Sequence, residues 1–433
     1  MRVSTPEFYQ SSLSGLLNQQ STLNNLSQQL STGNALIDPS SNPVAYAQTL
    51  NLSARIANLN QYQQSNNYAQ QNLQLSSSTL QSVSTLITQV QQLAVQMNNG
   101  TVNGKDLRNA VTAMQGNLQQ LVQLANTQDA NGSYIFGGSE SNRPPFQLQS
   151  NGSVQYLGDS AQKTLQIGPG LSVPSSQAGN AIFMNVPAGN GTFTVVPSGS
   201  NYSASSGASS GNVGTTTLGP GAVVDAKAAN DFFVAQGGQL VVTISNGTSG
   251  LTYSVSSGVG SGMASSGIVA SGTYTPGMSI SVPSAGGASP MLSVSTAGEP
   301  APGQSATFTL QPAGTQSIFQ TFQNLIQALQ AGSGSPGANT QRAQGISNAL
   351  ANLSQFQTTL LSTQATIGSE LQQAQNVSNL NTNLLQQFQT TQGNLQDVSY
   401  PQVITQFQQS STALQAAQKA FVQVQGLSLF QYI

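Results

Sequence analysis

Three charged residues near the middle of the chain, Asp225, Lys227 and Asp231, form its one central group of ionisable side chains. A pair of carboxylates at a suitable separation can supply the general acid and the general base of a hydrolase. Charged residues that cluster in this way are more typical of a solvated segment of the surface. We interpret these residues as a solvated loop and keep a catalytic carboxylate pair as the alternative.

A second candidate for chemistry is the glycine-rich segment 258–262, with the sequence GVGSG. It resembles a phosphate-binding loop only loosely, because it lacks the lysine of a P-loop and a helix to follow it. A turn in a Gly/Ser-rich sheet is the favoured interpretation. The chain also has no His and no Cys, which excludes the usual zinc and iron–sulfur sites, a cysteine nucleophile and a histidine-based triad. We predict a protein that is not an enzyme, with no catalytic residue, no cofactor and no metal.

The composition narrows the remaining classes of protein. The chain has 433 residues but only nine Lys or Arg and eleven Asp or Glu, with a net charge of −2. This charge gives no general attraction to nucleic acid or to anionic lipid. The first residues lack the apolar stretch of a signal peptide, and no run of about 18 apolar residues is present to span a membrane. We predict no nucleic-acid partner, no membrane segment and, if the chain is secreted, export by another route.

Proline divides the chain into three parts, and this division indicates where long helices can form. Of the 18 prolines, 14 lie between Pro144 and Pro336, whereas residues 44–143 and 337–400 contain none. Proline inside a helix costs about 3 kcal/mol, so both gaps permit helices, which we expect over about 46–143 and 317–398. Apolar residues recur there at coiled-coil spacing: Ser76, Leu80, Val83, Ile87, Val90, Ala94 and Met97 in the first part, and Ile346, Leu353, Leu360 and Ile367 in the second.

Both ends of the chain carry the same kind of pattern. Near the start, Leu16, Leu23 and Leu30 repeat every seven residues. Near the end, steps of four and three connect Val403, Phe407, Leu414, Ala417, Phe421 and Val424, with Ser410 out of character. These seams predict two terminal helices that pack against helical partners. The conformational entropy lost on ordering each terminal segment costs more free energy than burial of its own apolar side chains contributes. We therefore expect both ends to become ordered on assembly.

A turn should separate the N-terminal seam from the next helix. Pro39 and Pro43 lie four residues apart, and Asn42 stands directly before the second proline. The residue before a proline is disfavoured in helical conformation. We predict an interdomain turn at Pro39, Asn42 and Pro43, with a plain interhelix loop as the alternative.

The middle of the chain predicts β-structure. Short runs of β-branched and aromatic residues occur at 195–196, 240–244, 251–255, 278–282 and 306–310, and Asn-Gly pairs at Asn151, Asn190 and Asn246 suit tight turns. The Ser/Gly-rich stretch 197–221 is a linker or a long loop between two small β modules. The expected fold class is α+β: a long coiled-coil-like bundle built from the N- and C-terminal segments, with a central β-rich insertion.

Several short motifs occur near the two ends of the chain: LSTG at 30–33, Pro39, NPVA at 42–45, LANT at 124–127, GSYIFGG at 132–138, YP at 400–401, LQA at 414–416 and QGLSLF at 425–430. Together they resemble the flagellin superfamily, and within it the hook–filament junction family of hook-associated protein 3. The YIFGG and SLF segments are more specific to the junction family than to flagellin. The resemblance covers about the first 145 and the last 120 residues. Serine and asparagine stand at 40–42, where family members often carry acidic residues.

This resemblance implies a secreted structural subunit of the extracellular bacterial flagellum, located at the hook–filament junction. The implied partners are hook-associated protein 1, flagellin, further copies of the chain in a ring, and the flagellar export apparatus with its export chaperone. The assembly interface would comprise the two seams together with Leu427 and Phe430. The expected domains are an N-terminal assembly helix (1–45) that pairs with a C-terminal one (399–433), the two halves of a helical bundle (46–143 and 317–398), and a β-rich outer part (144–316) with an optional division near 197–221.

Two other functions compete with the junction protein. Flagellin itself shares the terminal helices and would be the filament subunit. A secreted adhesin or enzyme-like β domain on a helical stalk is a second alternative, although no motif in the centre supports catalysis. A cytoplasmic signalling coiled coil is disfavoured by the large β insertion.

Overall fold

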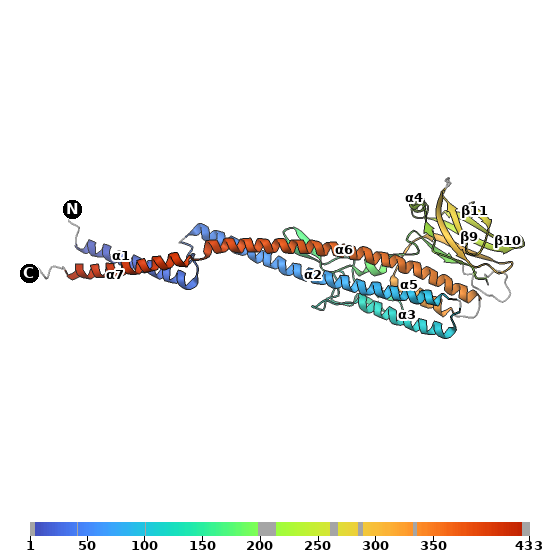
Figure 1. Ribbon diagram of the computed structural model, residues 1–433, viewed down its shortest axis with the longest axis horizontal. Coiled ribbons are helices and arrows are strands. Elements are labelled where there is room, and N and C mark those ends of the chain that lie inside the picture. Colours follow the sequence, from blue (N-terminus) through green and yellow to red (C-terminus); the bar gives the residue numbers. More distant parts are fainter. Residues whose placement is uncertain are drawn as a thin grey trace, which may run out of the picture. The chain divides into compact units, whose positions relative to one another are not determined.

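The computed structural model describes residues 5–40, 42–99, 101–197, 214–259, 267–284, 289–331 and 336–426. Long helices dominate both ends of the chain, and strands dominate its centre (Figure 1). The helices are α1 (Thr5–Thr32), α2 (Pro43–Met97), α3 (Gly104–Ala125), α4 (Ala226–Asn230), α5 (Ile318–Gln330), α6 (Pro336–Gln396) and α7 (Tyr400–Gly426), with π-helical turns η1 (Asn180–Met184) and η3 (Asp231–Ala235). This architecture confirms the α+β fold class expected from the sequence.

The strands are mostly short, and they form two main sheets and three two-stranded sheets, β1-β2, β3-β4 and β5-β15. They are β1 (Phe146–Leu148), β2 (Val154–Tyr156), β3 (Thr164–Gly168), β4 (Leu171–Pro174), β5 (Val186–Pro187), β6 (Phe193–Pro197), β7 (Thr217–Leu218), β8 (Ala222–Val223), β9 (Gly238–Gly247), β10 (Gly250–Val259), β11 (Ile268–Thr273), β12 (Ser279–Pro283), β13 (Pro290–Ala297), β14 (Ser305–Pro312) and β15 (Thr315–Gln316).

The chain divides into two compact units. The first comprises Met1–Asn67, Gln166–Leu171 and Gln375–Ile433, and the second comprises Tyr68–Leu165 and Ser172–Ala374. The first unit therefore contains α1, the start of α2, the end of α6 and α7. The rest of α2 and α6, with α3, α5 and the two main sheets, belongs to the second unit.

In the second unit, helices α2, α3, α5 and α6 enclose the larger hydrophobic core. The seam predicted from Ser76 to Met97 is buried along its whole length, and so is the seam from Ile346 to Ile367. Aromatic rings complete this core, with Phe183 in contact with Phe136, Phe146 and Phe356. The coiled-coil spacing thus predicted which faces of the two long helices are buried.

The prediction of helix over 46–143 fails after Ala125, where α3 ends. Residues 126–143 form turns and isolated bridges instead. Asn126 ends the helix, and its side chain both donates to the carbonyl oxygen of Phe146 at 2.7 Å and accepts from the Phe146 amide at 2.9 Å. The missed signal is the Asn-Gly pair at Asn131, since Gly132 adopts a φ of 78° that only glycine takes readily.

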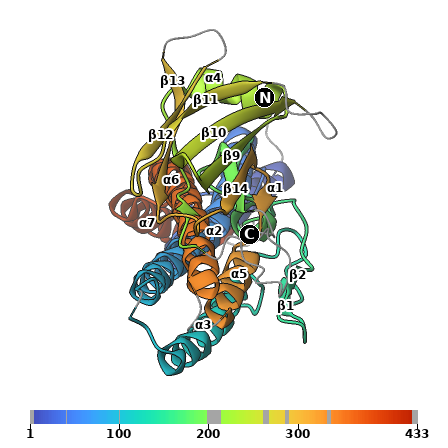
Figure 2. The same ribbon diagram turned by 90° about the vertical axis from the view of Figure 1, so that its right-hand side faces the viewer.

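The two main sheets share one core and form a β domain within the second unit. One sheet has the strand order β11-β10-β9-β14-β6, and the other has the order β12-β13-β7 with β8 also paired to β13. Figure 2 shows strands β9 to β13 gathered in one body, apart from helices α3 and α5. The five predicted β runs coincide with strands β6, β9, β10, β12 and β14, except that Met278 lies just before β12. The predicted turn at Asn151 joins the paired strands β1 and β2, and Asn190 lies in a turn before β6. The turn predicted at Asn246 is misplaced, because Asn246 is itself a residue of β9 and the turn to β10 is at Thr248 and Ser249. The segment 197–221, expected to be a linker or loop, contains β7, and residues 198–213 lie outside the described ranges.

Candidate assembly site

Helices α1 and α7 lie side by side and antiparallel in the first unit (Figure 1). The rings of Tyr9 and Phe421 have centroids 5.1 Å apart, and further along the pair the amide of Gln19 donates to the carbonyl oxygen of Ser410 at 3.5 Å. Near the other end, the Val398 amide donates to the Gly33 oxygen at 2.9 Å. Residues early in α1 therefore meet residues late in α7, as the paired terminal seams require.

The contact between the two helices is thinly packed. Its buried centre consists of Leu26, Val398 and Val403, with Leu30 and Phe407 packed against it. Among their described residues, the two helices carry one charged residue each, Glu7 in α1 and Lys419 in α7. No ion pair joins these two side chains in the described part of the chain. The pairing therefore rests on apolar contact and amide hydrogen bonds, in agreement with the low charge of the seams.

The structure brings most of the predicted interface residues together in this pair. Val403 is 7% exposed, and six other seam residues are half-buried: Leu16, Leu23, Leu30, Phe407, Leu414 and Phe421. Ala417 is exposed. The side chain of Val424, and both Leu427 and Phe430, lie outside the described residues. Sequence reasoning missed Leu26, which is buried and fills the gap between Leu23 and Leu30 in the seam.

A second set of apolar side chains on the same helices faces away from the pair. Leu17 is 59% exposed and Val422 is 63% exposed, and Leu13 and Ile404 are also exposed. Single exposed apolar residues are normal in monomeric proteins, but several large ones on two helices that already pair leave apolar surface available to a further partner. These residues, the outer stripe, escaped the heptad analysis because they lie outside its seven-residue repeat.

The turn predicted at Pro39, Asn42 and Pro43 lies between α1 and α2, and the three residues are exposed. The Asn42 side chain accepts a hydrogen bond from the Ala45 amide at 3.1 Å, which caps the N-terminus of α2. Pro43 is the first residue of the helix, where a missing amide hydrogen costs nothing. The local sequence therefore fixes where α2 begins.

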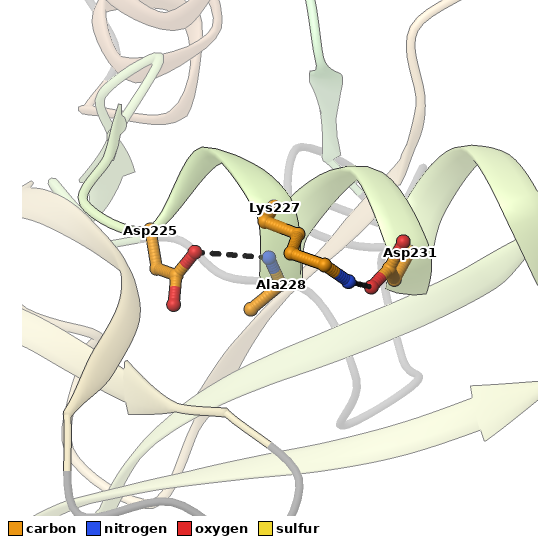
Figure 3. A network of polar contacts seen from close by, with 4 residues as sticks. All are labelled: Asp225, Lys227, Ala228 and Asp231. Carbon is orange, nitrogen blue, oxygen red and sulfur yellow. Dashed lines mark hydrogen bonds and ion pairs between the residues drawn. The ribbon is translucent and has the colours of Figure 1, made fainter.

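The central charged cluster is structural (Figure 3). Asp225 caps α4 by accepting from the Ala228 amide at 3.0 Å, and the Lys227 ammonium pairs with Asp231 at 2.6 Å across one helical turn. The hydrogen bond and the charge of Asp231 raise the pKa of Lys227. The carboxylates hold a short helix and an exposed ion pair, which agrees with a solvated segment, although the segment is helical and not a loop.

The other candidates for chemistry give no site in the described part of the chain. Gly258 and Val259 end strand β10, and residues 260–262 of the glycine-rich segment lie outside the described ranges. The described residues hold no group of three or more His, Cys, Asp or Glu that could bind a metal ion. None of the described helices combines the length and the hydropathy needed to cross a bilayer.

The YIFGG motif (residues 134–138) connects two segments of the second unit by backbone hydrogen bonds and contributes to its hydrophobic core. The Ile135 amide donates to the Thr127 oxygen, and the Ile135 oxygen accepts from the Gln177 amide at 2.8 Å. Phe136 is fully buried. Gly138 has a φ of 71°, and a Cβ there would meet the Asp159 side chain, so the motif requires glycine for steric reasons.

The same loop contains a buried carboxylate, Asp129. It accepts hydrogen bonds from the Tyr68 hydroxyl at 2.6 Å and from the backbone amides of Asn131 and Ser133 at 2.9 and 2.8 Å. Burial acts to raise the pKa of Asp129, but these hydrogen bonds, with one from Asn72, outweigh burial and hold the pKa below its ordinary value. Asp129 is thus a structural anion that ties the loop to α2.

Two comparisons of the sequence with known proteins both point to flagellar proteins. Residues 3–141 match the family described as the bacterial flagellin N-terminal helical region. The chain is 33% identical over 186 residues to the flagellar hook-associated protein 3 of Salmonella typhimurium, a match that covers 43% of this chain and 58% of that protein. The chain therefore spans less than two thirds of the length of this curated relative.

Solved structures agree in fold. The flagellar hook-associated protein-3 of Legionella pneumophila superposes with a TM-score of 0.68 at 25% identity, covering 79% of this chain and 98% of that one. The flagellar junction protein FlgL of Legionella pneumophila gives a TM-score of 0.65 at 26% identity, covering 81% of this chain and 100% of that one. These matches confirm the resemblance to the hook-associated protein 3 family of the flagellin superfamily.

Proposed function

We propose that this chain is a structural subunit of the bacterial flagellum that forms the junction between hook and filament by polymerising through its terminal helices. The observation that carries the proposal is the antiparallel α1–α7 pair, whose outer stripe leaves large apolar side chains exposed. The names of the relatives support the flagellar setting and a role in structure and not in catalysis.

Incomplete burial explains why the pair needs neighbours. Full burial of a large apolar side chain contributes about 1.5–3 kcal/mol relative to exposure. The four outer-stripe residues Leu13, Leu17, Ile404 and Val422 are about half exposed, so covering them would add at most about 3–6 kcal/mol per subunit. Helices of adjacent subunits, themselves low in charge, supply a matching apolar surface. Assembly then orders the ends and buries the seams together.

The proposed partners are further copies of this chain in a ring, hook-associated protein 1 on the hook side and flagellin on the filament side. We propose that the chain is secreted by the flagellar export apparatus with the help of an export chaperone, and that it resides in the extracellular flagellum. In the proposed domain plan, 1–45 and 399–433 are the assembly helices, 46–143 and 317–398 make the bundle, and 144–316 is the outer part. The interface would comprise the seams, the outer stripe, Leu427 and Phe430.

The decisive experiment replaces Leu414 and Phe421 in the strain that encodes this chain. The variant Leu414→Ser/Phe421→Ser should be secreted yet fail to retain filaments, because both side chains lie on the seam. The matched control is Ala413→Ser/Ala420→Ser, shifted by one residue onto exposed positions, and it should swim normally. Labelled-antibody electron microscopy should show a band at the hook–filament boundary. Normal filaments in the seam variant would refute the proposal.

Flagellin remains the second candidate, because the matched family description covers the flagellin N-terminal region. A filament subunit would be labelled along the whole filament and would be present in far greater amounts. The same microscopy therefore separates the two functions.

A further inference from the structure

Two edge strands of the β domain lie against helix α6. Strand β6 ends the order of the five-stranded sheet, and β7 ends the order of the other sheet. An edge strand presents unpaired amides and carbonyls, to which a strand of another molecule can pair. In this protein, side-chain amides of α6 occupy those positions.

Gln344 binds the edge of β7 as a neighbouring strand would. Its Oε1 accepts from the Leu218 amide at 2.8 Å, and its Nε2 donates to the Leu218 carbonyl oxygen at 2.8 Å. The next residue, Gly219, instead donates its amide to Ser295 of strand β13. Leu218 therefore directs both backbone groups away from β13, toward the open edge, and Gln344 satisfies both. The Gln344 side chain is 1% exposed.

Asn348, one turn further along α6, extends this arrangement to β6. Its Oδ1 accepts from Gln344 Nε2 at 3.0 Å, and its Nδ2 donates to the Val195 carbonyl oxygen at 3.1 Å. A continuous chain of hydrogen bonds thus runs from β7 through two amide side chains to β6. Thr340 and Asn352 continue the spacing of four residues, contacting the Gly214 oxygen at 2.8 Å and the Gly189 amide at 2.6 Å.

We propose that Gln344 and Asn348 form an edge cap that prevents a second copy of this chain from adding a strand to β6 or β7. The hydrogen bonds from the cap to the strands all end on backbone atoms, namely the Leu218 amide, the Leu218 oxygen and the Val195 oxygen, so they do not depend on the side chains of the strands. Its purpose rests on the proposed function, because a subunit that polymerises through terminal helices needs its sheet edges closed. The opposite edge, β11, is paired to β10 across a bulge between Val255 and Ser256, which is another way of protecting an edge.

The test compares Gln344→Ala/Asn348→Ala with Gln375→Ala/Asn379→Ala in the full-length monomer. The control pair has the same residue types and spacing on α6, is exposed, and makes a hydrogen bond only within the helix. Amide exchange of Leu218 should accelerate at least tenfold in the cap variant, with Val242 in the central strand β9 unchanged. Sedimentation should show concentration-dependent dimers of the cap variant alone.

A second variant, Gln344→Met, keeps the side-chain volume but cannot form the two hydrogen bonds. It covers the case in which the double variant fails to fold, and it should show the same faster exchange at Leu218. Unchanged exchange at Leu218 in this folded variant overturns the capping role. Faster exchange with a strictly monomeric protein at all concentrations overturns the protection against strand addition. Both readouts are independent of filament formation, so a failure of the flagellar proposal is distinguishable from a failure of this one.

Discussion

The close approach of α5 and α6 gives a quantitative prediction for the bundle core. Gly345 of α6 packs on Ala328 of α5, and a Cβ added at Gly345 would lie 2.5 Å from the Ala328 Cβ. Neither atom belongs to a flexible side chain that can move aside, so the helices must separate. Overpacking of this kind costs about 1–3 kcal/mol, whereas alanine in place of glycine stabilises a helix by about 1 kcal/mol. Gly345→Ala should therefore destabilise the protein by up to about 2 kcal/mol.

Gly368, in the same helix, provides the matched control. A Cβ there meets no atom within 4 Å, so Gly368→Ala should stabilise the helix by about 1 kcal/mol. The difference between the two variants, about 1–3 kcal/mol, is measured by urea unfolding followed by circular dichroism, with amide exchange of α5 as a local probe. Ala328→Gly in the Gly345→Ala background should recover part of the loss through coupling. Equal stability of Gly345→Ala and Gly368→Ala would refute the reasoning.

Three further predictions concern assembly and pH. Leu13→Ser/Leu17→Ser should abolish polymerisation, measured by light scattering. The stability of the monomer should not change, because both side chains are exposed. A loss of monomer stability would contradict the assignment of these residues to a surface that only a second subunit covers. Polymerisation should change little between low and high NaCl, because screening acts on charge and α1 and α7 carry one charged residue each, and a steep salt dependence would exclude apolar pairing. Since the pKa of Asp129 is lowered, its ionised form stabilises the fold above the unfolded pKa of about 3.9, and this stability is lost as pH falls through the folded pKa. Asp129→Asn should thus destabilise the protein at pH 7, with a smaller difference from wild type near pH 3, and a constant difference would contradict the assignment.

The long helices and their buried faces were predictable because heptad spacing states directly which side chains share a face. Residues such as Leu80 and Leu353 are fully buried where the pattern places them. The strands β9 and β14 were predictable for a different reason, because β-branched and aromatic residues are concentrated at 240–244 and 306–310. The prolines concentrated between Pro144 and Pro336 also predicted that long helices do not extend through the centre of the chain.

The features that the sequence did not reveal depend on backbone positions brought together from distant parts of the chain. Gln344 looks like any exposed amide in a Gln-rich helix, and only the structure shows it against Leu218. The strands β7 and β13 were missed because short or Ser-rich segments give a weak β pattern. The outer stripe was missed because a seam analysis selects the residues that face one partner and disregards those that face a second.

The pairing of α1 with α7 has a consequence for chains that are truncated during synthesis. Gln19 and Ser410, which touch across the pair, are separated by 391 positions in the sequence. A polypeptide truncated anywhere before Tyr400 would lack the whole of α7 and could not complete the adhesive pair. If the chain polymerises through this pair, only molecules synthesised through to α7 could be incorporated.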